Sequence, residues 1–158
     1  MRCPGARCSG AWGKRSAVRT QSHHRDCPIC ALGYPLDVLA ELTATWVTGA
    51  TEAPLPGYVC VVAKRHVAEP FELDGAERTA FWEDCMQAAR TLAHLYNPRK
   101  VNYEIHGNTI PHLHMHLYPR YAGDPYEGRP ITNDARFQRS REELARIGQA
   151  IRGSRAAP

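Results

Sequence analysis

The chain has 158 residues and a mass of 17.7 kDa, which suits one domain of ordinary size. Its hydrophobic share of 43% and charged share of 23% argue against wholesale disorder, and its longest apolar run, 58–63, is far shorter than the roughly 20 residues of a bilayer span. The overall formal charge is +4, but residues 1–25 carry six basic and no acidic side chains. The rest of the chain therefore has 14 basic against 16 acidic residues. That balance excludes a basic nucleic-acid-binding domain.

Residues 1–25 have the composition of an extension outside the folded domain. They combine Gly, Ser, Arg and Pro with almost no apolar residues that could form a core face. We expect a disordered extension, with a targeting segment or an arm for an anionic partner as the alternatives. The apolar stretch of a secretory signal is missing from this region, so we expect a cytoplasmic protein with its folded domain in residues 26–158.

The next segments predict two strands and a long helix. Residues 40–47 are rich in Thr, Trp and Val and predict a strand. The two Gly and two Pro of 48–57 predict a turn, and the continuous apolar run 58–63 predicts a largely buried strand. A helix over 74–97 is expected because Asp74 and Glu77 form a variant of the capping box, an apolar stripe follows, and Asn97-Pro98 ends it.

Three further elements follow the helix. Residues 101–105 alternate as a half-buried strand, 106–111 form a loop, and 112–118 predict another strand. The Gly-, Pro- and Asp-rich segment 122–134 is expected to be irregular, and 140–151 to form a second helix. Strands, a helix and then more strands predict an α+β domain with an antiparallel sheet.

Three histidines alternate along the strand expected at 112–118. Residues i and i+2 of a helix point about 200° apart, whereas on a strand they share one face at about 7 Å spacing. His112, His114 and His116 would therefore share one face, and the apolar residues between them would pack under the helix of 74–97. Because each ring brings a donor and an acceptor, we expect this face to line a cleft for catalysis or for a metal; a merely structural triplet is the remaining interpretation.

The cysteines divide into two kinds. Cys60 and Cys85 lie in apolar patterns and are most simply buried small hydrophobic residues. Cys27 and Cys30 are three positions apart at a turn and could bind one metal with two further ligands. A four-cysteine zinc ribbon that adds Cys3 and Cys8 is a rival interpretation, with His23 and His24 as spare donors. A disulfide framework is less consistent with the missing secretory signal.

The segment His112-Leu-His-Met-His-Leu-Tyr118 resembles the His-φ-His-φ-His-φ-φ signature of the histidine triad (HIT) family of nucleotide hydrolases and transferases. Residues 107–111 resemble the phosphate-binding loop of that family, and 56–66 its segment that ends in Lys-x-His. The resemblance covers about residues 27–120. It implies an α+β fold with a roughly five-stranded antiparallel sheet and one main helix. It also implies a homodimer, for which Phe81 and Trp82 are candidate interface residues.

The resemblance implies roles for the histidines in chemistry at a nucleotide. His114 would be the nucleophile that attacks the α-phosphorus, with its other ring nitrogen held by an acceptor such as a backbone carbonyl. His116 would donate a proton to the leaving group or a hydrogen bond to a phosphate oxygen. Asn108 and Thr109 would bind phosphate with the loop amides. Asn102 could reach the same cleft because it alternates with its neighbours along a strand, or it could simply be exposed to solvent. Thr109 could instead stabilise a turn.

In zinc-containing members of the family, the resemblance implies a structural site, which here would comprise Cys27, Cys30, His66 and His112. The expected substrates are dinucleoside polyphosphates or nucleoside phosphoramidates, cleaved at the α-phosphate; neither a membrane nor a nucleic acid is an expected partner. Two alternatives stay open from the sequence. One is a non-enzymatic nucleotide sensor, and the other is a metallohydrolase that uses the three histidines as zinc ligands.

Overall fold

The computed structural model describes residues 26–132 and 137–154. The predictions for residues 1–25, including those for Cys3, Cys8, His23 and His24, lie outside this part of the chain. No helix within the described ranges is both long and apolar enough to cross a membrane.

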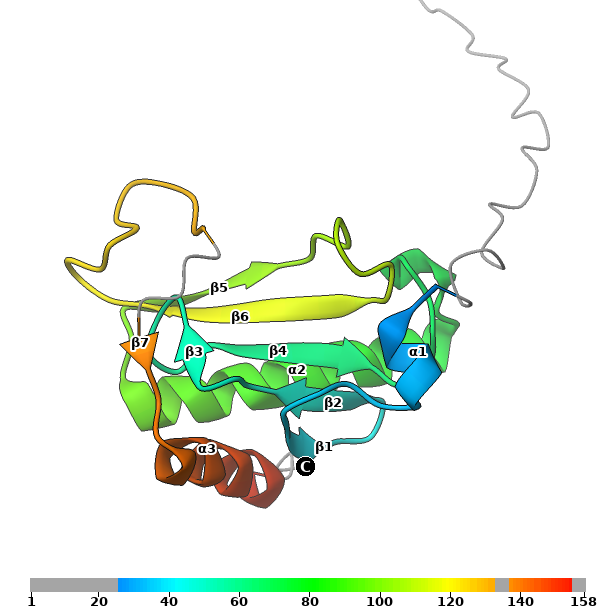
Figure 1. The fold of residues 1–158 in the computed structure, drawn as a ribbon, viewed down its shortest axis with the longest axis horizontal. Helices are drawn as coiled ribbons and strands as arrows, with labels where there is room; N and C mark the ends of the chain where they lie inside the picture. The colour runs from blue at the N-terminus through cyan, green and yellow to red at the C-terminus, as the bar shows by residue number, and fades with distance from the viewer. Residues whose placement is uncertain (1–25, 133–136, 155–158) are drawn as a thin grey trace, which may run out of the picture.

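A five-stranded antiparallel sheet forms the centre of the molecule (Figure 1). Its strands run in the order β1 (Val38–Glu41), β2 (Thr45–Thr48), β4 (Val59–Ala63), β6 (His114–Arg120) and β5 (Lys100–Glu104). A separate two-stranded sheet joins β3 (Glu52–Ala53) to β7 (Phe137–Gln138). The α+β class and the five-stranded antiparallel sheet are therefore confirmed.

The helices are α1 (Pro28–Leu32), the 3₁₀ turn η2 (Pro70–Glu72), α2 (Gly75–Tyr96) and α3 (Arg141–Gly153). The main helix begins where the sequence predicts. The Asp74 carboxylate accepts a hydrogen bond from the Glu77 backbone at 2.9 Å, and the Glu77 side chain accepts one from the Asp74 backbone at 3.2 Å. Asn97 ends the helix in the left-handed conformation, with a φ of 45°.

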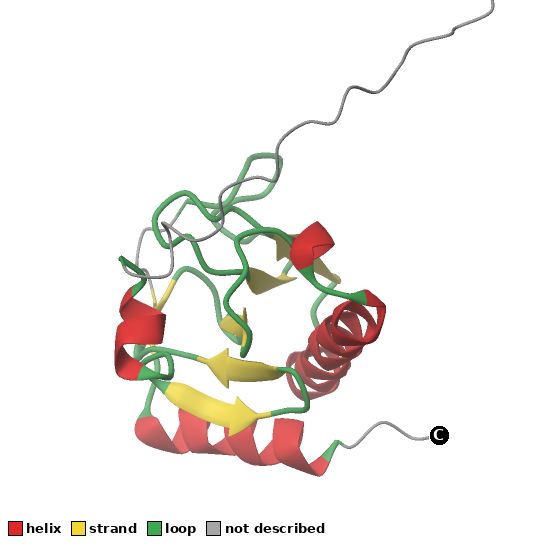
Figure 2. Cartoon of the chain, turned by 90° about the vertical axis from the view of Figure 1, so that its right-hand side faces the viewer, coloured by secondary structure: helices red, strands yellow, loops and turns green. Residues whose placement is uncertain are grey.

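The two faces of the sheet have different roles. Helix α2 lies against one face, and the short α1 lies on the opposite side (Figure 2). Strand alternation sends Val59 and Val61 of β4, and Met115 and Leu117 of β6, into the core beneath α2. The opposite face of the same two strands carries Cys60, Val62, His114 and His116. The predicted apolar face of the histidine strand is confirmed.

The single strand predicted over 40–47 is wrong, because the chain turns within it. Strands β1 and β2 pair with each other as an antiparallel hairpin, with Glu41 opposite Trp46. A buried carboxylate from α2 holds the turn between them. Asp84 accepts hydrogen bonds from the Ala44 backbone at 2.7 Å and the Thr45 hydroxyl at 3.0 Å. The predicted turn of 48–57 likewise contains the short strand β3.

The predicted start of the histidine strand is also wrong. Strand β6 begins at His114, not at His112, and continues through Pro119 to Arg120. The His112 backbone donates instead to the Ile110 carbonyl at 2.8 Å, and its ring turns toward His66 at a centroid separation of 5.0 Å. Only His114 and His116 therefore share the open face of β6.

Candidate functional site

The His114 ring is held in one tautomer by the backbone. Its Nδ1 lies 2.6 Å from the His112 carbonyl oxygen. A carbonyl oxygen can only accept, so Nδ1 carries the proton and donates it. In the neutral ring, Nε2 then keeps its lone pair. Because the same side chain lines a cavity, this arrangement provides a nucleophilic nitrogen at a ligand-accessible position.

His116 lies beside His114, with ring centroids 4.9 Å apart. Its Nδ1 is 2.7 Å from the Tyr58 hydroxyl. Burial is the main cause that raises the pKa of Tyr58 far above its ordinary range, so the phenol keeps its proton. Burial, followed by the nearby His114 and His106, lowers the pKa of His116 to about 4. At neutral pH His116 is therefore uncharged, and in the tautomer in which Tyr58 donates to Nδ1, its own proton is on Nε2.

The two histidines lie at one side of a cavity of about 290 Å³. Two elements from different parts of the chain form most of its wall: Cys60 and Val62 come from β4, while α1 and the segment after it supply the rim. That rim is Pro28, Ile29, Leu32, Tyr34, Pro35 and Leu36, and Thr48 and Ile110 complete the lining. A largely apolar wall beside two imidazoles suits a ligand with an apolar or planar part and a reactive polar part.

A second cluster of ligand-type side chains joins α1 to the sheet. Cys27, Cys30, His66 and His112 offer donor atoms that all lie within 4.8 Å of one another. The Nδ1 atom of His112 lies 3.4 Å from Cys27 Sγ, 3.7 Å from Cys30 Sγ and 3.2 Å from His66 Nδ1. A zinc tetrahedron with sulfur at about 2.3 Å and nitrogen at about 2.0 Å has edges of roughly 3.3–3.8 Å. The four donors are therefore spaced as zinc ligands are.

The surroundings of this cluster also fit a metal. The Nε2 of His112 donates to the Ala63 carbonyl at 2.7 Å, which turns the lone pair of Nδ1 toward the two sulfurs. Burial, together with Cys27, raises the pKa of the Cys30 thiol to about 11, so its thiolate needs a cation beside it. Because His112 is turned toward Cys27 and Cys30, the three histidines do not converge on one point, which weighs against their holding a catalytic zinc together.

The residues predicted to bind phosphate lie near this face but outside the cavity lining. Asn102 is half-buried on β5, opposite Tyr118 in the register of β6. Asn108 and Thr109 are exposed in the loop between β5 and β6, and Ile110 of that loop is the residue that lines the cavity. Their predicted contact with phosphate stays a prediction.

Comparison with known proteins decides the family. A model of the HIT domain matches residues 35–123, more than half of the chain. The chain belongs to the HIT family. The resemblance noted from the histidine motif is thereby confirmed.

Two curated HIT relatives align with the chain. A bis(5'-adenosyl)-triphosphatase of Dictyostelium discoideum is 28% identical over 106 residues, which are 62% of this chain and 71% of the relative. A bifunctional bis(5'-adenosyl)-triphosphatase/adenylylsulfatase of Arabidopsis thaliana is 28% identical over 93 residues, 56% of this chain. That alignment spans 51% of the Arabidopsis protein, so the chain covers about half its length.

Solved HIT structures share the fold. A histidine triad protein from Bradyrhizobium japonicum superposes with a TM-score of 0.66 at 23% identity, covering 74% of this chain and 88% of its own. A zinc-bound histidine triad family protein from Mycobacterium smegmatis gives a TM-score of 0.57 at 18% identity, covering 83% of this chain and 94% of its own.

Sequence reasoning missed three parts of this HIT site. Tyr58 and Cys60 face the histidines only because β4 pairs with β6, so that Cys60 lies opposite His116. The apolar run 58–63 indicates a strand but not its partner or register. The third part is α1, whose Pro28 and left-handed Gly33 are signals of a helix start and end, although five residues are too few for a helical period.

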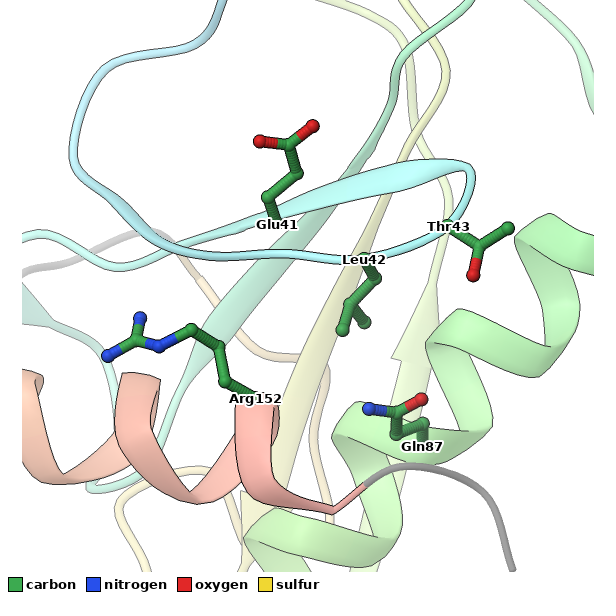
Figure 3. A pocket seen from close by; sticks show the side chains of 5 residues that line it. All are labelled: Glu41, Leu42, Thr43, Gln87 and Arg152. Atoms are coloured by element: carbon green, nitrogen blue, oxygen red, sulfur yellow. The ribbon is translucent and has the colours of Figure 1, made fainter.

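A larger hollow lies elsewhere in the molecule, between the β1–β2 turn, α2 and α3 (Figure 3). Its volume is about 510 Å³, and its lining is Glu41, Leu42, Thr43, Gln87 and Arg152. Three of these side chains have structural partners: Gln87 donates to the Ile151 carbonyl at 2.9 Å, Arg152 donates to the Leu39 carbonyl, and Glu41 pairs with Lys64 at 2.7 Å. None of these five described residues is a histidine or a cysteine, so the histidine cavity is the candidate functional site.

Proposed function

We propose that this protein hydrolyses a nucleotide derivative at its α-phosphorus through a nucleotidyl-histidine intermediate on His114. The observation that carries the proposal is the 2.6 Å hydrogen bond from His114 Nδ1 to the His112 carbonyl, which leaves the lone pair on Nε2 of a ring that lines the cavity. In the first step, Nε2 bonds to phosphorus as the bond to the leaving group breaks. In the second, water takes the place of Nε2 and releases the nucleoside monophosphate.

His116 is proposed to supply the proton that the leaving group needs. With Tyr58 donating to Nδ1, the exchangeable proton is on Nε2 of a ring whose centroid lies 4.9 Å from that of His114. Donation to the departing oxygen or nitrogen, or to a phosphate oxygen, lowers the barrier as negative charge develops. Asn108, Thr109 and Asn102 are proposed to bind phosphate oxygens from the loop and from β5.

The relatives support the proposed substrate class. Two proteins 28% identical to this chain are named bis(5'-adenosyl)-triphosphatases, which supports a nucleotide hydrolase in broad terms and favours dinucleoside polyphosphates over phosphoramidates. The apolar cavity wall suits a nucleobase. Assembly into a homodimer stays a prediction; Phe81 is buried in the core, whereas Trp82 is 39% exposed and is the better candidate for a contact between copies.

We further propose that Cys27, Cys30, His66 and His112 hold a structural zinc ion. Four protein ligands leave no position for water, so the ion would crosslink α1 to the sheet and take no part in bond cleavage. The zinc-bound state of the Mycobacterium smegmatis relative supports this assignment.

The histidine assignment is tested by His114→Ala in the full chain, with bis(5'-adenosyl) triphosphate as substrate. We expect turnover to fall by roughly 10³-fold or more and substrate affinity to stay within about tenfold, because the nucleophile is lost and the cavity wall is kept. Intact-protein mass spectrometry after an alkaline quench should detect a nucleotidyl adduct in the parent protein and none in the variant. His94→Ala, at an exposed position of α2, is the matched control; full activity in His114→Ala would refute the assignment.

A further inference from the structure

We propose that Cys60, His114 and His116 form a second metal site, distinct from the Cys27 cluster, at which a thiophilic divalent cation such as Zn²⁺ binds reversibly and blocks catalysis. The donor atoms of these three side chains lie within 4.8 Å of one another. The pairing of β4 with β6 explains why, since Cys60 stands directly opposite His116 and both side chains leave the same face of the sheet.

Hydrogen bonds already orient both imidazoles as ligating histidines are oriented. His114 Nδ1 donates to the His112 carbonyl at 2.6 Å, and His116 Nδ1 lies 2.7 Å from the Tyr58 hydroxyl. Histidines that bind metals characteristically have their second ring nitrogen engaged in this way. A phenol can donate or accept, so when Nε2 of His116 gives its lone pair to a cation, the ring proton is on Nδ1 and donates to the Tyr58 oxygen.

The third ligand determines the kind of cation. Burial raises the pKa of the Cys60 thiol to about 12, so Cys60 is a neutral thiol until a cation arrives. On binding, its proton passes to solvent and the thiolate offsets one of the two positive charges. One sulfur and two imidazole nitrogens select zinc and other thiophilic ions over Mg²⁺ and Ca²⁺, which prefer oxygen.

The position of the site predicts inhibition. All three side chains line the 290 Å³ cavity. A tetrahedral cation bound by three protein ligands has a fourth coordination position, which water or a phosphate oxygen in the cavity could occupy. A cation bound there uses the lone pair of His114 Nε2, which is the pair that would attack phosphorus. The two metal sites share no ligand, so a structural zinc at Cys27 and an inhibitory zinc at Cys60 can coexist.

The binding of the metal stands apart from the proposed function, whereas the inhibition rests on it. Binding is tested by equilibrium dialysis of the full chain against buffered Zn²⁺, with the parent protein, Cys60→Ser, Cys60→Val and the control Cys85→Ala, at a position on the buried side of α2 in the core. We expect both Cys60 variants to bind one equivalent fewer than the parent protein and than Cys85→Ala. Cobalt substitution provides a second readout, because the loss of one thiolate ligand lowers the sulfur-to-cobalt charge-transfer absorbance.

Inhibition is tested with bis(5'-adenosyl) triphosphate, each variant being compared with itself with and without added Zn²⁺. We expect the half-inhibiting Zn²⁺ concentration to rise roughly tenfold or more in both Cys60 variants and to stay unchanged in Cys85→Ala. Equal zinc stoichiometry and affinity in all four proteins would overturn the site. If the Cys60 variants lose one equivalent of zinc but are inhibited like the parent protein, the inhibitory role is overturned. If the parent protein is inactive, the proposed function is contradicted, and the zinc stoichiometry still decides whether the Cys60 site exists.

Discussion

The tautomer of His116 depends on a single phenol. The Tyr58 hydroxyl lies 2.7 Å from its Nδ1, and the Tyr58 ring stacks on Tyr118 with ring centroids 4.9 Å apart. The tautomer of His114 is set by the backbone carbonyl of His112, which accepts a hydrogen bond from its Nδ1. When Tyr58 donates to His116, the outer nitrogens of the two neighbouring imidazoles differ in protonation, with a lone pair on Nε2 of His114 and a proton on Nε2 of His116.

At this scale, Tyr58→Phe tests the donor role of His116. The substitution keeps the stacking and removes one hydrogen bond, which is worth about 1 kcal/mol. We expect kcat to fall roughly fivefold, while KM changes little, because His116 then populates the tautomer with its proton on Nδ1. Steady-state kinetics measure both values. Tyr121→Phe, which also loses a hydrogen bond but one to the Pro56 carbonyl, should leave kcat unchanged; an unaltered kcat in Tyr58→Phe would contradict the role.

A second residue-scale prediction concerns acid stability. Asp124 accepts two hydrogen bonds from Arg120, at 2.7 and 2.9 Å, and the pair is largely buried, with side-chain exposures of 3% and 14%. The hydrogen bonds from Arg120 are the main cause that lowers the pKa of Asp124. A depressed carboxyl pKa contributes stability above the unfolded-state pKa of about 3.9, and this stability is lost as pH falls through the lower folded-state pKa.

Asp124→Asn should therefore lower the free energy of unfolding by about 3 kcal/mol at pH 7, since Arg120 then keeps a largely buried charge without the carboxylate that it hydrogen-bonds. The difference from the parent protein should shrink as pH falls below about 4. Urea unfolding at pH 7 and pH 3 measures both effects. Glu127→Gln, at an exposed ion pair with Arg99, should change stability by under about 1 kcal/mol, and equal behaviour of the two variants would contradict the prediction.

Among the elements, α3 packs so closely on β1 that only glycine fits at one position. A Cβ at Gly148 would lie 2.4 Å from the backbone oxygen of Leu39, whereas at Gly153 of the same helix it would meet nothing within 4 Å. Glycine to alanine in a helix ordinarily stabilises by about 0.5–1 kcal/mol. We expect Gly153→Ala to behave in that way and Gly148→Ala to destabilise by about 1–3 kcal/mol. Thermal unfolding of both variants compares them, and a stabilised Gly148→Ala would disprove the tight packing.

The short helix α1 depends on the Cys27 cluster. It is five residues long, too short to be stable alone, yet it supplies part of the cavity rim. We expect Cys27→Ser to lose the structural metal and to raise KM about tenfold, with a smaller effect on kcat because His114 and His116 stand on β6. Steady-state kinetics and amide hydrogen exchange over residues 27–36 measure these effects, with Cys85→Ala as the control. Slow exchange and an unchanged KM in metal-depleted Cys27→Ser would show that α1 does not depend on the Cys27 cluster.

At the scale of the whole molecule, the features that could be predicted from the sequence are those set by residues near one another in the chain. The helix starting after Asp74 could be predicted because its cap and its apolar stripe are local signals, and the histidine motif indicated the family. The remainder depends on contacts distant in sequence. The hairpin at 42–44 needs Asp84, and the departure of His112 from the strand reflects Cys27, which is 85 positions earlier. Tyr58 and Cys60 became visible as site residues only once the register of β4 against β6 was known.

One feature outside the matched HIT region connects the far end of the chain to the cavity. Arg139 is 5% exposed and donates at 2.5 Å to the carbonyl of Tyr58, the residue whose ring orients His116. The helix that follows places Ile147 and Ile151 fully inside the core. The cooperative folding unit therefore extends at least thirty residues beyond position 123, where the family match ends. A chain that ended at position 123 would leave uncovered the apolar surfaces of β1 and α2 that α3 contacts, and would lose the hydrogen bond that Arg139 donates to the backbone of Tyr58.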